Sequence, residues 1–348
     1  VFLNGEYWGV YVQRVRYDEH YFQTYYGIAP QDLVILKVES QLIIGDPADV
    51  QLFDEMLRFI EESFKDRQRL VSDALTDNAK YQTIASMMDI DNFIDYMITG
   101  IFVNNQDWIR NNNYYWRTIN GGSDESLYGH DGKWRWMVND LDEALHDPLH
   151  NRLVETIDQP QRTSFLFRSL LQNETFRLQF LNRFADLLNT LFREEVVLAK
   201  IDEFEALFLP EMEEQIQRWG QPGGSVEEWQ ENVEEMREFA RLRPEIQRQQ
   251  LVDYFSLAGT AQLQVRMNPT QGHILINSIE IREGATGVAD AASWTGIYFK
   301  GLPIRVTAVP AEGYRFSYWE GLEGGVETDE SVEITMRGDL EQTAVFTR

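Results

Sequence analysis

The stretch NNQDWIRNN, at residues 104–112, decides how the rest of this sequence is interpreted. It interrupts a helical region with polar and aromatic residues, and functional residues are often found in such segments. Asp107 and Asn112 have the Asp-x4-Asn spacing of a kinase catalytic loop, where the carboxylate takes up a hydroxyl proton and the amide oxygen helps to bind metal. A helix cap or a hub of loop hydrogen bonds explains Asp107 equally well at this level.

Residues on either side of this stretch add to the same chemistry. The strand-like run at 134–138 leads into Asp140 and Asp142, which offer hard oxygen ligands for Mg²⁺, although a solvated turn is the simpler interpretation. Residues 33–38 predict a strand buried on both faces. Lys37, near the end of that strand, is placed like the strand lysine that neutralises nucleotide phosphates. Together these residues predict a site for phosphoryl transfer.

Composition excludes several other classes of protein. The 348 residues carry 31 basic and 57 acidic side chains, a formal charge of −26, which argues against a nucleic-acid partner. The chain has no cysteine, so disulfides, thiolate catalysis and Cys-ligated metal sites are excluded. No apolar run approaches the ~20 residues of a membrane helix, so we expect no membrane span. The chain opens at Val1 within a strand-like pattern and without a signal peptide, so we expect a piece of a longer protein.

The hydrophobic pattern predicts strands first, then helices. A turn at Asn4-Gly5 precedes a strand expected over residues 7–12. Helical periodicity dominates from about residue 46 to 255, and Asp89 is placed to cap one of the helices. An apolar stripe runs from Phe176 to Leu191. The residues expected off this stripe are Arg177, Arg183 and Asp186.

The pattern changes again near residue 260. Short alternating runs separated by Gly, Pro and Asn then predict a small all-β sandwich or barrel. The fold class is therefore α+β, with domains expected at 1–256 and 260–348.

Three other interpretations stay open. His146 and His150 are four residues apart, as in a zinc site on one helix face, but Pro148 argues against a continuous helix there. Asp107 and Asp140 have the residue types of a glycosidase pair. Five tryptophans have the side chains of stacking platforms for carbohydrate, although packing in the core is the commoner role. They are Trp8, Trp108, Trp116, Trp134 and Trp136.

The order of several short segments resembles the spore coat protein H (CotH) kinase family over residues ~1–255. The segments are NGEYWGVY at 4–11, Leu36-Lys37, NQDW at 105–108 with Asn111-Asn112, KWRW at 133–136, DLD at 140–142, and the helical tract from Phe165 to Pro244. The resemblance implies an atypical protein-kinase-like domain with a partial N-terminal sheet and a large helical lobe. It also implies a function, the metal-dependent transfer of phosphate from ATP to Ser or Thr of a protein substrate.

The resemblance also implies roles for individual residues. Asp107 is the catalytic carboxylate, and Lys37 contacts the phosphates of ATP. Asn112 and Asp140 are ligands of Mg²⁺ or Mn²⁺, with Asp142 as a second acidic contact. Asn111 competes with Asn112, because the family pattern carries both.

The sequence also departs from the family pattern in its N-terminal part. Family members have an upstream segment that completes the N-terminal lobe, and they tend to carry a Glu near Gln13, Arg14 and Val15. The alternative is therefore a non-catalytic surface, adhesion or carbohydrate-binding protein built on a kinase-like scaffold.

The C-terminal part resembles the divergent B-repeat modules of bacterial surface proteins. GYRFSYWEG at 313–321 carries this resemblance, together with the runs at 332–336 and 343–346. Gly313 suits a turn, and Phe316 and Trp319 are expected in the core. Such modules imply an exported or surface-associated bacterial protein that contacts a cell surface or polysaccharide through this domain.

Overall fold

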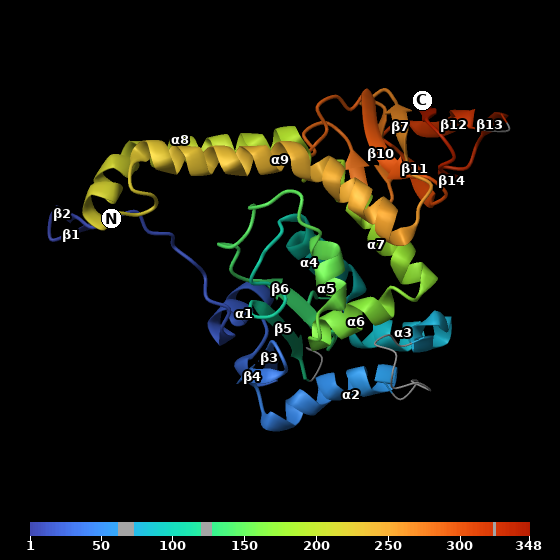
Figure 1. The fold of residues 1–348 in the computed structure, drawn as a ribbon. Coiled ribbons are helices and arrows are strands. Elements are labelled where there is room, and N and C mark those ends of the chain that lie inside the picture. Colours follow the sequence, from blue (N-terminus) through green and yellow to red (C-terminus); the bar gives the residue numbers. More distant parts are fainter. Residues whose placement is uncertain (62–72, 120–126, 323–324) are drawn as a thin grey trace. The chain divides into compact units, whose positions relative to one another are not determined.

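The computed structural model describes residues 1–61, 73–119, 127–322 and 325–348 (Figure 1). The chain forms two compact units, one made of Val1–Arg177 with Glu213–Pro222 and the other of Leu178–Met212 with Gly223–Arg348. Helices accompany β-sheets in both units, which confirms the predicted α+β class. The boundary near residue 256 stays a prediction of domain organisation.

The first unit contains a two-stranded hairpin (β1 and β2), a four-stranded sheet (β3 to β6) and several helices. Its strands are β1 (Phe2–Leu3), β2 (Glu6–Tyr7), β3 (Leu33–Lys37), β4 (Gln41–Ile44), β5 (Asn113–Thr118) and β6 (Arg135–Val138). Its helices are α1 (Glu19–Tyr26), α2 (Val50–Glu61), α3 (Asn78–Met87), α4 (Ile90–Phe102), α5 (Arg152–Asp158) and α6 (Arg162–Leu170), with 3₁₀ turns at Pro30–Asp32, Pro47–Asp49 and Asp73–Thr76. Three helices follow: α7 (Glu174–Leu188), α8 (Glu194–Trp219) and α9 (Val226–Phe255).

The four-stranded sheet has the order β4-β3-β5-β6, and all its neighbours are antiparallel. Leu33 and Ile35 of β3 pack with Trp116 and with Phe22 of α1 on one face. On the other face Tyr115 of β5 lies against Phe53 of α2, with ring centroids 4.4 Å apart. Residues Leu33 to Leu36 are all buried, so the prediction of a strand covered on both faces is confirmed.

The N-terminal hairpin is shorter than its sequence predicts. Asn4 and Gly5 have φ of 53° and 84° and form the expected turn, but strand pairing ends at Tyr7. The expectation of a strand over residues 7–12 is therefore wrong. The backbone beyond Tyr7 bonds to side chains instead: Val10 N donates to Gln215 Oε1, and Trp8 O accepts from Trp219 Nε1.

Helix α4 ends at Phe102, just before the polar stretch at residues 104–112. Asp89 caps this helix as predicted, since its side chain accepts a 3.0 Å hydrogen bond from Asn92 N. The other carboxylate oxygen of Asp89 accepts from Nε of buried Arg135 at 2.9 Å. Asp131 accepts two further hydrogen bonds from the same guanidinium. This paired charge ties β6 to the start of α4.

The second unit contains two sheets, as the sandwich prediction requires. Its strands are β7 (Thr260–Arg266), β8 (Gly272–Ile276), β9 (Ile279–Ile281), β10 (Ser293–Phe299), β11 (Pro303–Pro310), β12 (Arg315–Leu322), β13 (Gly325–Glu327), β14 (Ser331–Thr335) and β15 (Leu340–Thr347). The sheet orders are β10-β7-β15-β12-β13 and β14-β11-β8-β9. Trp319 is fully buried and Gly313 has a φ of 83° at a turn, both as predicted. Phe316 packs beside Trp319 but is only half-buried, so it lies at the border of the core.

Two expectations for the apolar stripe of α7 are wrong. Leu191 lies beyond the end of the helix and is exposed. Asp186, expected off the stripe, is fully buried. Its carboxylate accepts hydrogen bonds from Ser278 N and Oγ, Asn277 Nδ2 and Tyr298 OH. These donors come from the β-strand region and make it possible to bury a carboxylate that the helix pattern predicts to be exposed to solvent.

None of the helices in the described parts of the chain combines the length and hydropathy that a bilayer crossing requires.

Candidate functional site

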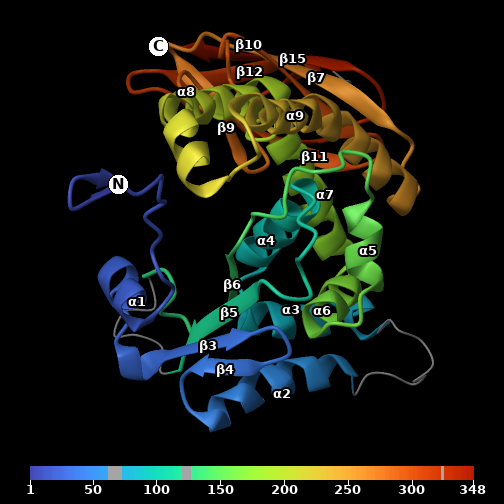
Figure 2. The same cartoon turned by 60° about the vertical axis from the view of Figure 1, so that its left-hand side comes forward.

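Strand pairing brings the predicted site segments to one edge of the four-stranded sheet. Lys37, at the end of β3, pairs with Tyr114 near the start of β5, and Asn113 pairs with Val138 at the end of β6. Figure 2 shows these strands side by side. The loop before β5 (residues 103–112) and the loop after β6 (residues 139–150) therefore begin at the same edge.

Four hydrogen bonds join these two loops. They run from Gln106 N to Glu143 O (2.9 Å), from Leu145 N to Val103 O (2.7 Å), from Asn105 Nδ2 to Asp140 O (2.9 Å) and from Asn104 Nδ2 to Asp147 O (2.9 Å). The two asparagine side chains that take part are almost completely buried. Arg152 adds a bond from its Nε to Asn104 Oδ1 at 3.0 Å, and burial lowers the pKa of its guanidinium. The loops thus form one hydrogen-bonded assembly.

Asn105 links the two acidic positions directly. Its Oδ1 accepts from Asp107 N at 3.2 Å, while its Nδ2 donates to Asp140 O. Asp140 has a φ of 55°, a left-handed conformation that is uncommon outside glycine. Such conformations persist where the surroundings hold them, and they cluster at functional sites. Sequence reasoning gave Asn105 no role of its own, although it lies in the quoted polar stretch.

Substitution of Asn105 by alanine should loosen the site. The change leaves Asp107 N and Asp140 O without their partner in a partly buried setting, so the free energy of unfolding should fall by about 1–2 kcal/mol. Urea denaturation measures this loss. Asn268→Ala, at an asparagine whose side chain bonds to Thr270 in its own exposed turn, is the control, with an expected change below ~0.5 kcal/mol. Equal losses in the two variants would contradict the linking role.

Asp107 sits between two asparagine amides. Its Oδ2 accepts from Asn111 Nδ2 at 2.7 Å and from Asn112 Nδ2 at 3.2 Å. Asn112 is buried and Asn111 is exposed. Asp107 is thus a hub of loop hydrogen bonds, and the same bonds fix the orientation of its carboxylate.

The other predicted residues are less closely tied to this group. The carboxylate of Asp140 is partly exposed, and its Oδ1 lies 4.0 Å from Arg14 Nη1. Asp142 is exposed in the turn that the bond from Ala144 N to Leu141 O closes. Lys37 lies with its ammonium 5.1 Å from the centroid of the Tyr114 ring. Direct hydrogen bonds thus join Asp107 to Asn111 and Asn112. Asp140 is connected to Asp107 through the side chain of Asn105. Lys37 and Asp142 lie on the same edge, with no hydrogen bond to that group among the described residues.

The oxygen atoms of this group suit a hard divalent cation. Asn111 and Asn112 use their amide nitrogens on Asp107, and their amide oxygens accept no hydrogen bond from the described residues. The described part of the chain contains no cluster of three or more His, Asp or Glu side chains arranged for a metal. The Asp140 carboxylate and the Asn112 amide oxygen are nevertheless ligand types that fit Mg²⁺, because this ion commonly binds one or two carboxylates and completes its shell with phosphate and water.

A pocket of about 400 Å³ adjoins this edge of the sheet. Residues 15–19 line it together with Ile43 and Ile44 of β4, Tyr114 of β5 and Asn139. Asn139 is the neighbour of Asp140, and the Tyr114 ring also contacts the ammonium of Lys37. The pocket thus connects the surroundings of Lys37 with those of Asp140.

The structure disfavours two of the alternatives. Residues 144–150 are not helical, and His150 is 2.7 Å from Glu155, so the two histidines do not share a helix face. Four of the proposed carbohydrate platforms are core residues, since Trp108, Trp116, Trp134 and Trp136 are each at most 5% exposed. Trp8 packs edge-on against Trp219. The four buried tryptophans therefore do not serve as stacking platforms for carbohydrate.

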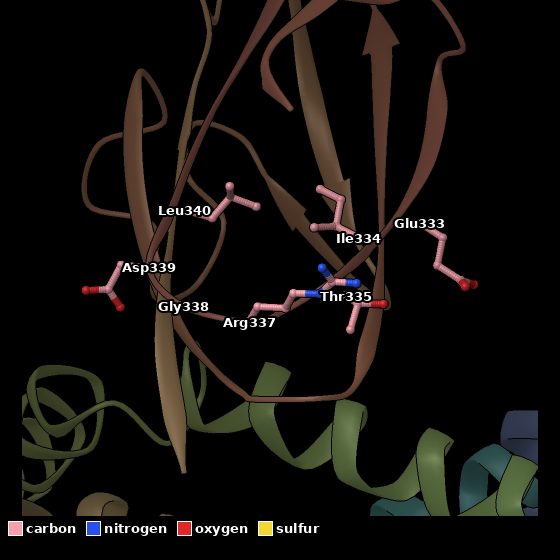
Figure 3. A pocket seen from close by; sticks show the side chains of 7 residues that line it. All are labelled: Glu333, Ile334, Thr335, Arg337, Gly338, Asp339 and Leu340. Carbon is pink, nitrogen blue, oxygen red and sulfur yellow. The ribbon is translucent and has the colours of Figure 1, made fainter. Parts of the chain in front are cut away.

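A further pocket, of about 470 Å³, lies in the second unit (Figure 3). The residues that line it are Glu333, Ile334, Thr335, Arg337, Gly338, Asp339 and Leu340, at the end of β14 and the start of β15. No aromatic side chain lines it, so it offers no stacking surface to a sugar ring.

The catalytic-loop spacing after α4 and the acidic turn after β6 are joined in one assembly, as expected of a kinase-like protein, and the family match supports a kinase-like fold. The chain belongs to the CotH kinase protein family, which matches residues 1–246, and the predicted membership over residues ~1–255 is confirmed. The divergent InlB B-repeat domain matches residues 277–348, which confirms the second resemblance. No curated protein matches the chain significantly.

Proposed function

We propose that this protein transfers the γ-phosphoryl group of ATP to a Ser or Thr hydroxyl of a protein substrate. The observation that carries the proposal is the Asn105 side chain, which holds the Asp107 loop and the Asp140 turn together at the edge of the sheet. Membership of the CotH kinase protein family supports the use of ATP.

The chemistry assigns one task to each residue. Asp107, oriented by the amides of Asn111 and Asn112, accepts the proton of the substrate hydroxyl as its oxygen bonds to the γ-phosphorus. The bond from that phosphorus to the β–γ bridging oxygen breaks, and ADP leaves. Asp140 and Asn112 would hold Mg²⁺ or Mn²⁺, with Asp142 as a second acidic contact, and the ion supplies charge neutralisation on the phosphates. Lys37 would also contact the phosphates of ATP.

The B-repeat match supports a location outside the cell. We propose that the protein is bacterial and exported or surface-associated, and that its β domain contacts the cell surface or a polysaccharide.

Calorimetric titration of ATP, with and without Mg²⁺, tests the site. We expect binding that requires the metal, and Asp140→Ala should weaken it at least 10-fold because a carboxylate ligand is lost. Asp329→Ala removes an exposed carboxylate of the second unit and should bind like the unchanged protein. If this chain binds no ATP at all, the proposal is overturned for it, and the non-catalytic scaffold becomes the better interpretation.

A further inference from the structure

Arg14 faces the predicted metal ligand Asp140. Its Nη1 is 4.0 Å from Asp140 Oδ1, within the distance of an ion pair. The contact is loose, because the Arg14 side chain is 74% exposed and that of Asp140 is 36% exposed. A long cationic side chain in this position can turn toward another anion without breaking any packing.

The chain just after Arg14 is attached beside the site. Tyr17 OH donates to Val138 O at 3.1 Å, which ties Tyr17 to the end of β6. Asp18 then caps α1 by accepting from His20 N and Tyr21 N. Arg14 thus lies three residues before a position that is bonded to the strand leading to Asp140.

Three other cations near the site already have partners, whereas Arg16 lines the pocket next to Arg14 in the chain. The Lys37 ammonium lies over the Tyr114 ring, and Arg110 Nη2 donates to Gln106 O. Arg152 is paired with Glu155 at 2.8 Å. Since the chain carries a charge of −26, a phosphate ligand needs a local cation that can turn toward it.

The nearby pocket is lined by residues that adjoin Arg14 and Asp140 in the chain. Residues 15–19 and Asn139 are among them. A guanidinium in this place can bind phosphate oxygens through two parallel hydrogen bonds.

We propose that Arg14 has two alternating partners: it neutralises Asp140 while no metal is bound, and it contacts the phosphates of the nucleotide once a metal occupies Asp140. The nucleotide role rests on the proposed function, whereas the pairing with Asp140 is tested by metal alone. Arg14 is then the cation that changes partners in this site. Arg14 and Lys37 together supply positive charge to the phosphates.

The two partners predict effects of opposite sign for Arg14→Gln. Affinity for Mn²⁺ alone, measured by electron paramagnetic resonance of the free ion, should rise about 2–5-fold because a competing cation is removed. Affinity for ATP in the presence of Mg²⁺, measured by calorimetry, should fall about 10-fold because a charge-assisted hydrogen bond is lost. Arg58→Gln, at an exposed arginine of α2, removes the same charge and should change neither quantity by more than twofold.

The two readouts separate the possible failures. If the unchanged chain binds no ATP, the proposed function fails, and the Mn²⁺ measurement still decides whether Arg14 competes for Asp140. If the chain binds ATP and Arg14→Gln binds it equally well, the nucleotide role of Arg14 is overturned. A Mn²⁺ affinity that stays the same or falls overturns the pairing with Asp140. Thermal unfolding of the variant should match that of the unchanged protein, because the contact is solvent-exposed.

Discussion

Asp107→Asn is expected to slow phosphoryl transfer to a protein substrate by about 10²–10⁴-fold, the range for loss of a positioned general base. The carboxylate accepts two amide hydrogen bonds through Oδ2. An asparagine of the same shape keeps an oxygen for those donors but offers no base for the hydroxyl proton. The rate of ³²P incorporation from labelled ATP into a Ser- and Thr-rich acceptor protein measures the effect.

The control for Asp107→Asn must separate catalysis from folding and binding. ATP affinity should stay within about threefold of the unchanged protein, because Asp107 is assigned to the hydroxyl and not to the nucleotide. Asp329→Asn, an equally conservative change at an exposed position of the second unit, should leave the rate unchanged. Transfer at an undiminished rate by Asp107→Asn would show that Asp107 is only the loop hub.

Asp186→Asn is expected to change how stability depends on pH. Burial raises the pKa of Asp186 to about 6, from an ordinary value of 3.8, although hydrogen bonds from Ser278, Asn277 and Tyr298 oppose this shift. The folded state therefore holds the proton more tightly than the unfolded chain does. The stability that this proton contributes is present below pH 3.8 and is lost as the pH rises through about 6.

The pH shift has a size that denaturation can detect. A pKa difference of this extent corresponds to roughly 3 kcal/mol. Part of this effect is already lost at pH 4, so the free energy of unfolding of the unchanged protein minus that of Asp186→Asn should fall by about 2 kcal/mol between pH 4 and pH 7, whatever its value at pH 4. Urea denaturation across this range provides the two curves. For Asp253→Asn, at an exposed carboxylate of α9, the curve of unfolding free energy against pH should instead run parallel to that of the unchanged protein. Parallel curves for Asp186→Asn would contradict the raised pKa.

The outcome for Asp186 shows how a pattern-based prediction fails. The spacing of apolar residues on α7 separates a buried stripe from a polar face, and Asp186 falls on the polar face of that pattern. The structure buries it because Ser278, Asn277 and Tyr298 supply donors from segments far away in the sequence. Helical periodicity contains no information about partners of this kind.

Features that depend on neighbours along the chain follow from the amino-acid sequence. These are the buried strand at Leu33–Lys37, the cap at Asp89, the β-rich C-terminal part and the Asp107–Asn112 spacing. Three other features depend on how distant segments pack: Asn105 joins Asp107 to Asp140, Arg14 faces Asp140, and the strand that begins at Glu6 ends at Tyr7. The physical reason is that periodicity and capping act within a few residues, whereas a polar side chain finds its partner only after distant segments have packed.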